Sequence, residues 1–241
     1  MKIADSTILV TGANRGLGKA LVEEALKRGA KRVYAGARQP IVHADRRVAP
    51  LTLDLTSAAQ IQAAVGKVGT LDILINNAGI AIQNDLSDRA ALERLLAVNL
   101  FGTYDVIQAF VPVLARSHGA IVNVLSLAGL AAVPFDSLYS ISKAAAFSLS
   151  QSLRSLLAGR GVSVHIVLPG PIDTDMSRNL DIPKASPESV ARAIFDGVEK
   201  GEEEIFPDPM SAAVAEGRRS SAVKALQRQF AAYAEQSPVR S

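Results

Sequence analysis

Short runs of apolar residues alternate along the chain with longer segments whose apolar positions recur at helical spacing. The short runs are almost uninterrupted, as in Ile8-Leu9-Val10, which is typical of strands covered on both faces of a sheet. Seven strands are predicted over Thr7–Thr11, Arg32–Gly36, Val48–Asp54, Ile73–Asn76, Ala120–Leu125, Ser163–Leu168 and Glu204–Phe206. The longer segments predict helices over Leu17–Arg28, Ala58–Val68, Asp88–Val98, Phe101–Arg116, Tyr139–Arg160 and Pro187–Lys200. This alternation predicts an α/β fold in which helices cover both faces of a doubly wound parallel sheet.

The C-terminal part of the sequence continues the same pattern. No repeat, low-complexity block or linker divides the chain, so residues 1–241 are expected to form one domain. A helical extension is predicted over about residues 211–241, with its helix at Ser220–Ala234. Val223, Leu226 and Phe230 fall at helical spacing there and could pack on the domain, join a subunit interface or cover a pocket.

Composition narrows the possible classes of function. Hydrophobic residues make up 49% and charged residues 20% of the chain, an ordinary globular mixture. There is no cysteine, which excludes disulfides and thiolate chemistry, and the three histidines lack ligand spacing, so no metal site is expected. Five basic and two acidic residues from Ser211 onward account for the whole net charge of +3, which favours a solvated helix face over a nucleic-acid surface. No apolar run approaches a membrane span and no signal-peptide pattern is present, so a cytoplasmic protein without membrane contact is expected.

A glycine-rich segment joins the first predicted strand to the first predicted helix, with the sequence Thr11-Gly12-Ala13-Asn14-Arg15-Gly16-Leu17-Gly18. Glycines at such a turn allow the backbone to approach a pyrophosphate closely, and the helix N-terminus offers free N–H groups and the positive end of a dipole. A glycine string alone could be a structural turn. The strand-turn-helix context favours a dinucleotide site and a Rossmann-like fold.

Further landmarks follow this turn in a characteristic order, from about Thr7 to Met176. They are Asp54-Leu55, Asn76-Asn77-Ala78-Gly79, Asn99, Ser126, Tyr139-x-x-x-Lys143 and Pro169-Gly170. Together with the glycine turn, this set resembles the short-chain dehydrogenase/reductase family. Two departures stand out: the nine residues between Arg38 and Val48 are too few for the helix that many relatives have there, and the short segment after Met176 argues against a long substrate lid.

The resemblance, together with the residue pattern, implies a set of site residues. The implied catalytic residues are Asn99, Ser126, Tyr139 and Lys143. The implied cofactor-binding residues are Gly12, Asn14, Arg15, Gly16, Leu17, Gly18, Arg38, Asp54, Leu55, Asn77, Ala78, Gly79, Tyr139, Lys143, Pro169, Gly170, Ile172 and Thr174. Asp54 corresponds to a residue that hydrogen-bonds adenine but could instead cap the next helix, and Asn76 could be purely structural.

The position about 20 residues beyond the glycine turn distinguishes the two nicotinamide cofactors. A site for NAD places an acid there to bind the ribose 2′-hydroxyl, but no acid occurs between Glu24 and Asp45 and the position holds Arg38. Arg38 could be an ordinary surface arginine. With Arg15 in the glycine turn as a second cation, it suits a 2′-phosphate instead, and the sequence predicts NADP(H).

The predicted reacting centre combines a helix face with a strand end. Tyr139 and Lys143 are one helical turn apart, and the ammonium is expected to lower the pKa of the tyrosine. The resemblance makes Tyr139 the acid in carbonyl reduction and the base in alcohol oxidation. Ser126 could hydrogen-bond the substrate oxygen, whereas Ser142 is expected to point elsewhere. Asn99 within a helical segment indicates a local distortion that presents polar groups to Lys143.

The expected reaction is reversible hydride transfer between NADP(H) and a ketone, aldehyde or secondary alcohol. A serine hydrolase is a rival, but no G-x-S-x-G elbow is present and His165 lies in an apolar strand, where packing is the simpler role. A sensor or scaffold that binds the cofactor without turnover, an epimerase and an enoyl reductase stay open as alternatives. The substrate is expected to have hydrophobic flanks, because candidate pocket positions are apolar: Ile82, Leu127, Phe135, Leu138 and Met176. The long apolar helices Phe101–Arg116 and Tyr139–Arg160 predict a homodimer or homotetramer.

Overall fold

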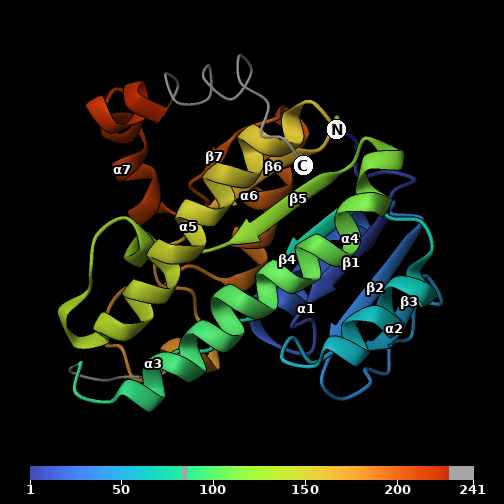
Figure 1. Ribbon diagram of the computed structural model, residues 1–241, viewed down its shortest axis with the longest axis horizontal. Coiled ribbons are helices and arrows are strands. Elements are labelled where there is room, and N and C mark those ends of the chain that lie inside the picture. The colour runs from blue at the N-terminus through green and yellow to red at the C-terminus, as the bar shows by residue number, and fades with distance from the viewer. Residues whose placement is uncertain (83–85, 228–241) are drawn as a thin grey trace.

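The computed structural model describes residues 1–82 and 86–227, which form a seven-stranded sheet with all neighbouring strands parallel (Figure 1). The strands lie in the order β3-β2-β1-β4-β5-β6-β7. Their bounds are β1 Thr7–Thr11, β2 Arg32–Ala37, β3 Val48–Thr52, β4 Ile73–Asn76, β5 Ala120–Val124, β6 Ser163–Val167 and β7 Glu204–Ile205. The predicted doubly wound parallel sheet is confirmed. Strands β3, β5, β6 and β7 end one or two residues earlier than predicted, because the chain turns there into the loops at the carboxyl edge.

Helices cover both faces of the sheet, as predicted (Figure 1). The helices α1 (Gly16–Lys27) and α6 (Pro187–Lys200) pack on one face, and α2 (Ala58–Val68), α4 (Thr103–Ser117) and α5 (Ser137–Ala158) pack on the other. Successive residues of β1 point to opposite faces of the sheet and so contribute to two hydrophobic cores. Ile8 and Val10 face α1, whereas Leu9 faces α4. The absence of a helix between β2 and β3 agrees with the short spacing seen in the sequence.

The order of the strands locates the site. From the inner strand β1, the chain continues to β2 and β3 on one side, and then to β4, β5, β6 and β7 on the other. Loops after adjacent strands β1 and β4 therefore lead away in opposite directions and leave a crevice at the carboxyl edge, where ligands bind in open α/β sheets. Most residues of the candidate site lie on loops or helix starts at this edge, while Asn99 lies within the helical run that precedes β5 and Lys143 in the second turn of α5 (Ser137–Ala158).

A long helical run precedes β5. The predicted helices Asp88–Val98 and Phe101–Arg116 are joined into one run of α3 (Arg89–Leu96), a π-helical segment η1 (Ala97–Gly102) and α4. By length and composition alone, this run of 29 residues could cross a membrane. In the fold, however, its apolar residues Ile107 and Phe110 are buried against the sheet with α2 and β4.

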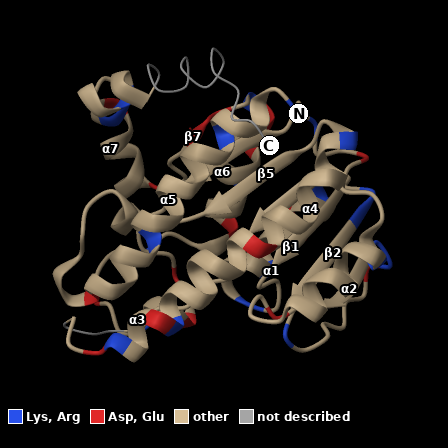
Figure 2. Cartoon of the chain, viewed as in Figure 1, with Lys and Arg blue, Asp and Glu red and all other residues tan. Residues whose placement is uncertain are grey.

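The C-terminal region differs from the prediction. A helix that the sequence pattern did not separate, α7 (Pro209–Arg219), starts soon after β7, and a further helical stretch occupies residues 222–227. The predicted helix Ser220–Ala234 is thus interrupted at its start, and its residues from 228 onward, including Phe230, lie outside the described residues. Figure 2 shows basic and acidic residues interspersed over the visible elements, in keeping with the near balance of charge.

Candidate active site

The glycine turn between β1 and α1 has the backbone that the sequence predicts. Gly12 has a φ of +66°, and a Cβ added there would lie 2.8 Å from Ala78 Cα. A Cβ added at Gly18 would lie 2.0 Å from Gly12 O, so the backbone of the glycine-rich segment is in close contact with the first turn of α1. Asn14 is exposed on the turn, whereas the side chain of Leu17 is buried in the core and leaves only its backbone for a ligand.

The start of α1 is free to bind an anion. Arg15 is the N-cap residue, its side chain does not cap the helix, and the first turn contains no acidic residue. The first N–H groups of the helix and its positive dipole end therefore face the crevice. This is the arrangement that binds phosphate groups at helix N-termini.

The segment after β4 holds the glycine turn in place. Asn77 Nδ2 donates to the carbonyls of Thr11 and Gly12 at 3.0 and 3.2 Å, and Thr11 Oγ1 accepts from the backbone N–H groups of Asn77 and Ala78. Asn76 is buried between β4 and β5, where its Nδ2 donates to Asn123 Oδ1 at 2.8 Å, and this contact favours the structural interpretation of Asn76.

Arg38 and Asp54 lie at the outer end of the crevice, after β2 and β3. Arg38 is exposed, and its charge contributes to lowering the pKa of Asp54, although hydrogen bonds from Thr56 contribute more. Asp54 Oδ1 accepts from the N–H and hydroxyl of Thr56 at 2.9 and 2.7 Å. The alternative that Asp54 caps α2 is wrong, since Ser57 is the N-cap and accepts from the N–H of Gln60.

Arg15, the second cation that the sequence predicts for the 2′-phosphate, is paired with an acidic side chain in the structure. Its Nη1 lies 2.9 Å from Asp175 Oδ2, and Asp175 also pairs with Arg178. These side chains are exposed, so the Arg15 pair is weak and can be exchanged for another anion. Thr174, which precedes Asp175, lies over the turn, because its Cγ2 would be 3.0 Å from a Cβ added at Gly16.

The remaining predicted cofactor residues follow β3 and β6. Leu55 is buried in the hydrophobic core that includes α2 and α4, so its side chain supports the site through packing. The Pro169 carbonyl accepts from the N–H of Leu127 at 3.0 Å, next to Ser126. Ile172 forms a parallel bridge with Ala185 and packs against the α1–α6 core. The prediction that these residues contact a cofactor stays a prediction.

Tyr139, Lys143 and Ser126 meet at the end of β5. The side chains of Tyr139 and Ser126 are close enough for the Ser126 hydroxyl to lower the pKa of the Tyr139 phenol. Lys143 Nζ lies 5.6 Å from the centroid of the Tyr139 ring and donates to the carbonyl of Val124 at 3.1 Å. Two hydroxyls and an ammonium are thus brought together at the carboxyl edge, as the sequence predicts.

The pKa values differ from the expectation. Burial raises the pKa of Tyr139 above its usual value; the hydrogen bond from Ser126 opposes this increase and the charge of Asp136 adds to it. Burial also lowers the pKa of Lys143 to about 8. The expectation that Lys143 lowers the tyrosine pKa is wrong here, because the loss of hydration of a buried phenolate dominates and the ammonium lies against the ring.

Asn99 lies in the π-helical segment η1, which is the distortion that the sequence indicates. Its Oδ1 accepts from the N–H of Ile80 and its Nδ2 donates to the Ile80 carbonyl, both at 2.9 Å. The distortion thus presents Asn99 to the backbone beside Gly79, where an added Cβ would be 3.2 Å from Asn99 Oδ1 and 3.7 Å from Lys143 Nζ. Asn99 therefore fixes the wall that Lys143 faces.

Two further residues complete the site and escaped the sequence prediction. Ser142 was expected to point elsewhere, but it is buried and its Oγ accepts from Asn99 Nδ2 at 2.9 Å. Asp136 is the N-cap residue of α5, yet its side chain makes no capping bond, and within the described part of the chain its buried Oδ1 has no hydrogen-bond partner. Both residues lie three positions from Tyr139, the spacing that places side chains on one helix face.

The predicted apolar wall is only partly realised. Leu138 is buried with Ala91 and Leu95 against α3, so it is a core residue. Ile82 and Leu127 are half-buried, while Phe135 and Met176 are exposed. His165 is a packed strand residue, as predicted, with its Nδ1 2.6 Å from the carbonyl of Glu202.

Comparison with known proteins agrees with this architecture. A sequence profile described as short chain dehydrogenase matches residues 6–184. The 2-(S)-hydroxypropyl-CoM dehydrogenase 3 of Xanthobacter autotrophicus is 35% identical over 211 residues, which cover 80% of this chain and 82% of that protein. The ketoacyl reductase HetN of Nostoc is 30% identical over 226 residues, which cover 85% and 79%.

A solved structure is similar over nearly the whole fold. A short chain dehydrogenase from Burkholderia cenocepacia in complex with NADP is 38% identical, with a TM-score of 0.87 over 95% of this chain and 98% of that one. The doubly wound sheet and these similarities define an oxidoreductase. The chain belongs to the short-chain dehydrogenase family.

Proposed function

We propose that the protein catalyses reversible hydride transfer between NADP(H) and a substrate that is a ketone or aldehyde in one direction and an alcohol in the other. The observation that carries this proposal is the pair of neighbouring hydroxyls of Tyr139 and Ser126, with the Lys143 ammonium over the tyrosine ring. This group lies at the same sheet edge as the glycine turn. A nucleotide site and a proton donor are therefore available to one crevice.

The residues present fit a dinucleotide that carries a 2′-phosphate. The tight glycine turn and the start of α1 suit the pyrophosphate, and exposed Arg38 suits the additional phosphate. The nearest acid after β2 is Asp45, which is paired with Arg47 at 2.7 Å and is engaged in its own loop. The bound NADP of the Burkholderia cenocepacia relative supports this choice of cofactor.

The reaction uses the protonation state of Tyr139. When bound, NADPH supplies the hydride that adds to the substrate carbonyl carbon. The Tyr139 hydroxyl donates its proton to the carbonyl oxygen, which Ser126 stabilises by a hydrogen bond as negative charge develops. Because burial raises the pKa of Tyr139, the phenol is protonated at neutral pH, as an acid must be. Alcohol oxidation requires the phenolate, so its proton-transfer step is expected to accelerate as pH rises, up to the alkaline range in which Lys143 loses its ammonium.

Lys143 is proposed to hold the nicotinamide ribose through its ammonium. Its buried ammonium lies between Gly79, a predicted cofactor-binding residue, and the ring of Tyr139, the proposed proton donor. With a pKa of about 8, the ammonium predominates at neutral pH and is progressively lost in alkaline solution. Asn99 and Ser142 act through the Gly79–Ile80 backbone as positioning residues.

The substrate is proposed to carry hydrophobic groups, since Leu127 and Phe135 flank the segments that bear Ser126 and Tyr139. The named relatives act on chemically different compounds, so no single substrate is transferred from them. We also propose a homodimer or homotetramer, because η1, α4 and α5 expose large apolar side chains: Phe101, Tyr104, Ile141 and Leu156. The cytoplasmic location and the absence of nucleic-acid and membrane partners stay predictions.

A turnover screen tests the proposed function directly. Diverse ketones, aldehydes and alcohols would be offered with NADPH/NADP⁺ and with NADH/NAD⁺ at the same concentrations. We expect turnover of carbonyl compounds with apolar substituents and a preference for the phosphorylated cofactor. Tight NADPH binding without turnover of any compound would support the sensor or scaffold instead.

A further inference from the structure

Asp208 connects the C-terminal helix to the loop that follows β6. It is the N-cap residue of α7, and its side chain is buried with 6% of the residue exposed. Its Oδ1 accepts from the N–H of Ser211 at 3.0 Å, which is the ordinary helix cap. Its Oδ2 accepts from the N–H of Gly170 at 2.8 Å, 38 residues earlier in the chain. One carboxylate therefore fixes two segments.

Gly170 is enclosed by this contact. A Cβ added at Gly170 would lie 3.0 Å from Asp208 Oδ1 and 3.2 Å from Met210 Cβ, so the backbone is pressed against the first turn of α7. On its other side, the Pro169 carbonyl accepts from the N–H of Leu127, beside Ser126. The Pro169–Gly170 turn is thus held between the reacting centre and α7.

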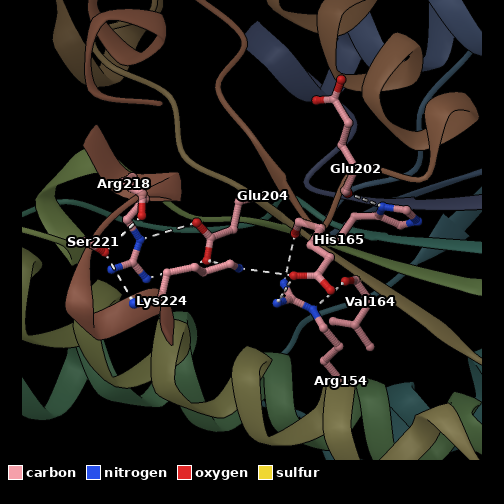
Figure 3. A network of polar contacts seen from close by, with 9 residues as sticks. Arg154, Val164, His165, Glu202, Glu204, Arg218, Ser221 and Lys224 are labelled. Carbon is pink, nitrogen blue, oxygen red and sulfur yellow. Dashed lines mark hydrogen bonds and ion pairs between the residues drawn. The ribbon is translucent and has the colours of Figure 1, made fainter. Parts of the chain in front are cut away.

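The helix that carries this contact is itself firmly anchored. Figure 3 shows Glu204 of β7 between Arg218 and Lys224, at 3.2 and 3.0 Å. All three side chains are almost completely buried, and the guanidinium of Arg218 also lies 5.2 Å from the centroid of the Phe147 ring in α5. These contacts hold α7 against β7 and α5. The Asp208 carboxylate at the start of α7 is therefore held in place as the acceptor for the Gly170 N–H.

We infer that Asp208 is a positioning residue for the nicotinamide end of the cofactor, acting through the Gly170 N–H. The inference rests on the proposed function: Pro169 and Gly170 are among the predicted cofactor-binding residues, and because this segment lies beside Ser126 at the reacting centre, the nicotinamide is the part of the cofactor that it would meet. A charge-assisted hydrogen bond to a buried carboxylate holds the turn in one place, and the adenosine end of the crevice, near Arg38, is built by other elements. Loss of Asp208 should therefore weaken one end of the cofactor contact selectively.

The test compares two ligands on the full chain. NADP⁺ contains the nicotinamide, whereas adenosine 2′,5′-bisphosphate contains only the phosphorylated adenosine end. We expect Asp208→Ala to raise the Kd for NADP⁺ several-fold and at most about tenfold, the limit reached if the whole free energy of the lost hydrogen bond to a charged group is needed to hold Gly170 in its binding position. The Kd for adenosine 2′,5′-bisphosphate should stay within about twofold of the wild-type value, because that ligand does not reach Gly170.

Ser211→Ala is the matched control. It removes the hydroxyl that donates to Asp208 Oδ2 at 2.9 Å and accepts from the Asp208 N–H, while the Gly170 contact stays. We expect a lower thermal stability and unchanged affinities for both ligands. If Asp208→Ala does not fold, Gly170→Ala provides the same test, since its methyl group would push the turn away from Asp208.

The outcomes separate the inference from the proposed function. Unchanged NADP⁺ affinity in Asp208→Ala, equal losses for both ligands, or the same selective loss in Ser211→Ala would each overturn the positioning role. Failure of the wild-type chain to bind NADP⁺ would instead overturn the proposed cofactor, and the positioning role with it.

Discussion

Charge reversal at Arg38 is the sharpest test of the cofactor. Arg38 directly follows β2 and is close enough to Asp54 for its charge to contribute to lowering the pKa of that carboxyl. In Arg38→Asp, a cation that would attract the 2′-phosphate is replaced by an anion that repels it. The new carboxylate can also accept a hydrogen bond from the free 2′-hydroxyl of NADH, so the two cofactors should respond in opposite directions.

The magnitude follows from the exposure of the site. A hydrogen bond to a charged group is worth about 1.5–3 kcal/mol, and the exposed position of Arg38 argues for the lower end, about 1.5 kcal/mol. Repulsion between a carboxylate and a phosphate of nearly two charges adds about 1 kcal/mol at physiological salt. The sum of about 2.5 kcal/mol corresponds to a loss of NADPH affinity between about tenfold and a hundredfold.

The assay is a pair of dissociation constants for NADPH and NADH at one stated ionic strength. Arg15→Ala is the comparison variant: we expect a smaller loss in the same direction, because Arg15 must first leave Asp175 and its removal adds no repulsion. An unchanged ratio of the two constants in Arg38→Asp would refute the phosphate contact. Equal losses for both cofactors would indicate general damage to the crevice and refute the argument as well.

Three other expectations concern the pH dependence, the C-terminal anchor and the assembly. Asp136→Asn removes a negative charge that raises the pKa of Tyr139, so the pKa of Tyr139 should fall. The pH profile of alcohol oxidation should then move to lower pH, and a shift to higher pH or no shift would contradict this. Glu204→Gln removes the carboxylate that the buried side chains of Arg218 and Lys224 share, and should lower the free energy of unfolding by about 3 kcal/mol in denaturant titrations. Glu203 is exposed, so Glu203→Gln should lower the free energy of unfolding by less than about 1 kcal/mol. Similar losses in the two variants would contradict this expectation. Leu156→Glu on the exposed face of α5 should lower the mass measured by light scattering to that of the monomer, and an unchanged oligomer would place the interface elsewhere.

The sequence predicts the architecture well because the fold depends on local pattern. Nearly continuous apolar runs predict strands that helices cover on both faces of the sheet, and each such run is a strand of the parallel sheet. The glycine turn is equally predictable, since a positive φ at Gly12 and the close approach at Gly18 require glycine. The hydroxyls of Ser126 and Tyr139 meet because a strand end and a helix start are brought to one edge.

Contacts between distant segments limit such predictions. Ser142 binds Asn99 from a different helix, and Asp208 binds Gly170 across 38 residues, so neither contact leaves a periodic signal. The direction of the Tyr139 pKa depends on burial, which a four-residue spacing to a lysine does not report. Spacing does offer one missed indication: Ser142 lies three residues after Tyr139 and thus on its helix face.

Substitution of Tyr139 by phenylalanine tests the central claim most directly. The ring and its packing beside Lys143 are kept, and only the hydroxyl next to Ser126 is lost. General acid catalysis contributes about 100-fold or more, so carbonyl reduction should fall at least that far while the Kd for NADPH stays at its wild-type value. A Tyr139→Phe variant that binds NADPH normally and keeps more than about a tenth of the wild-type rate would contradict the role of this hydroxyl as the proton donor.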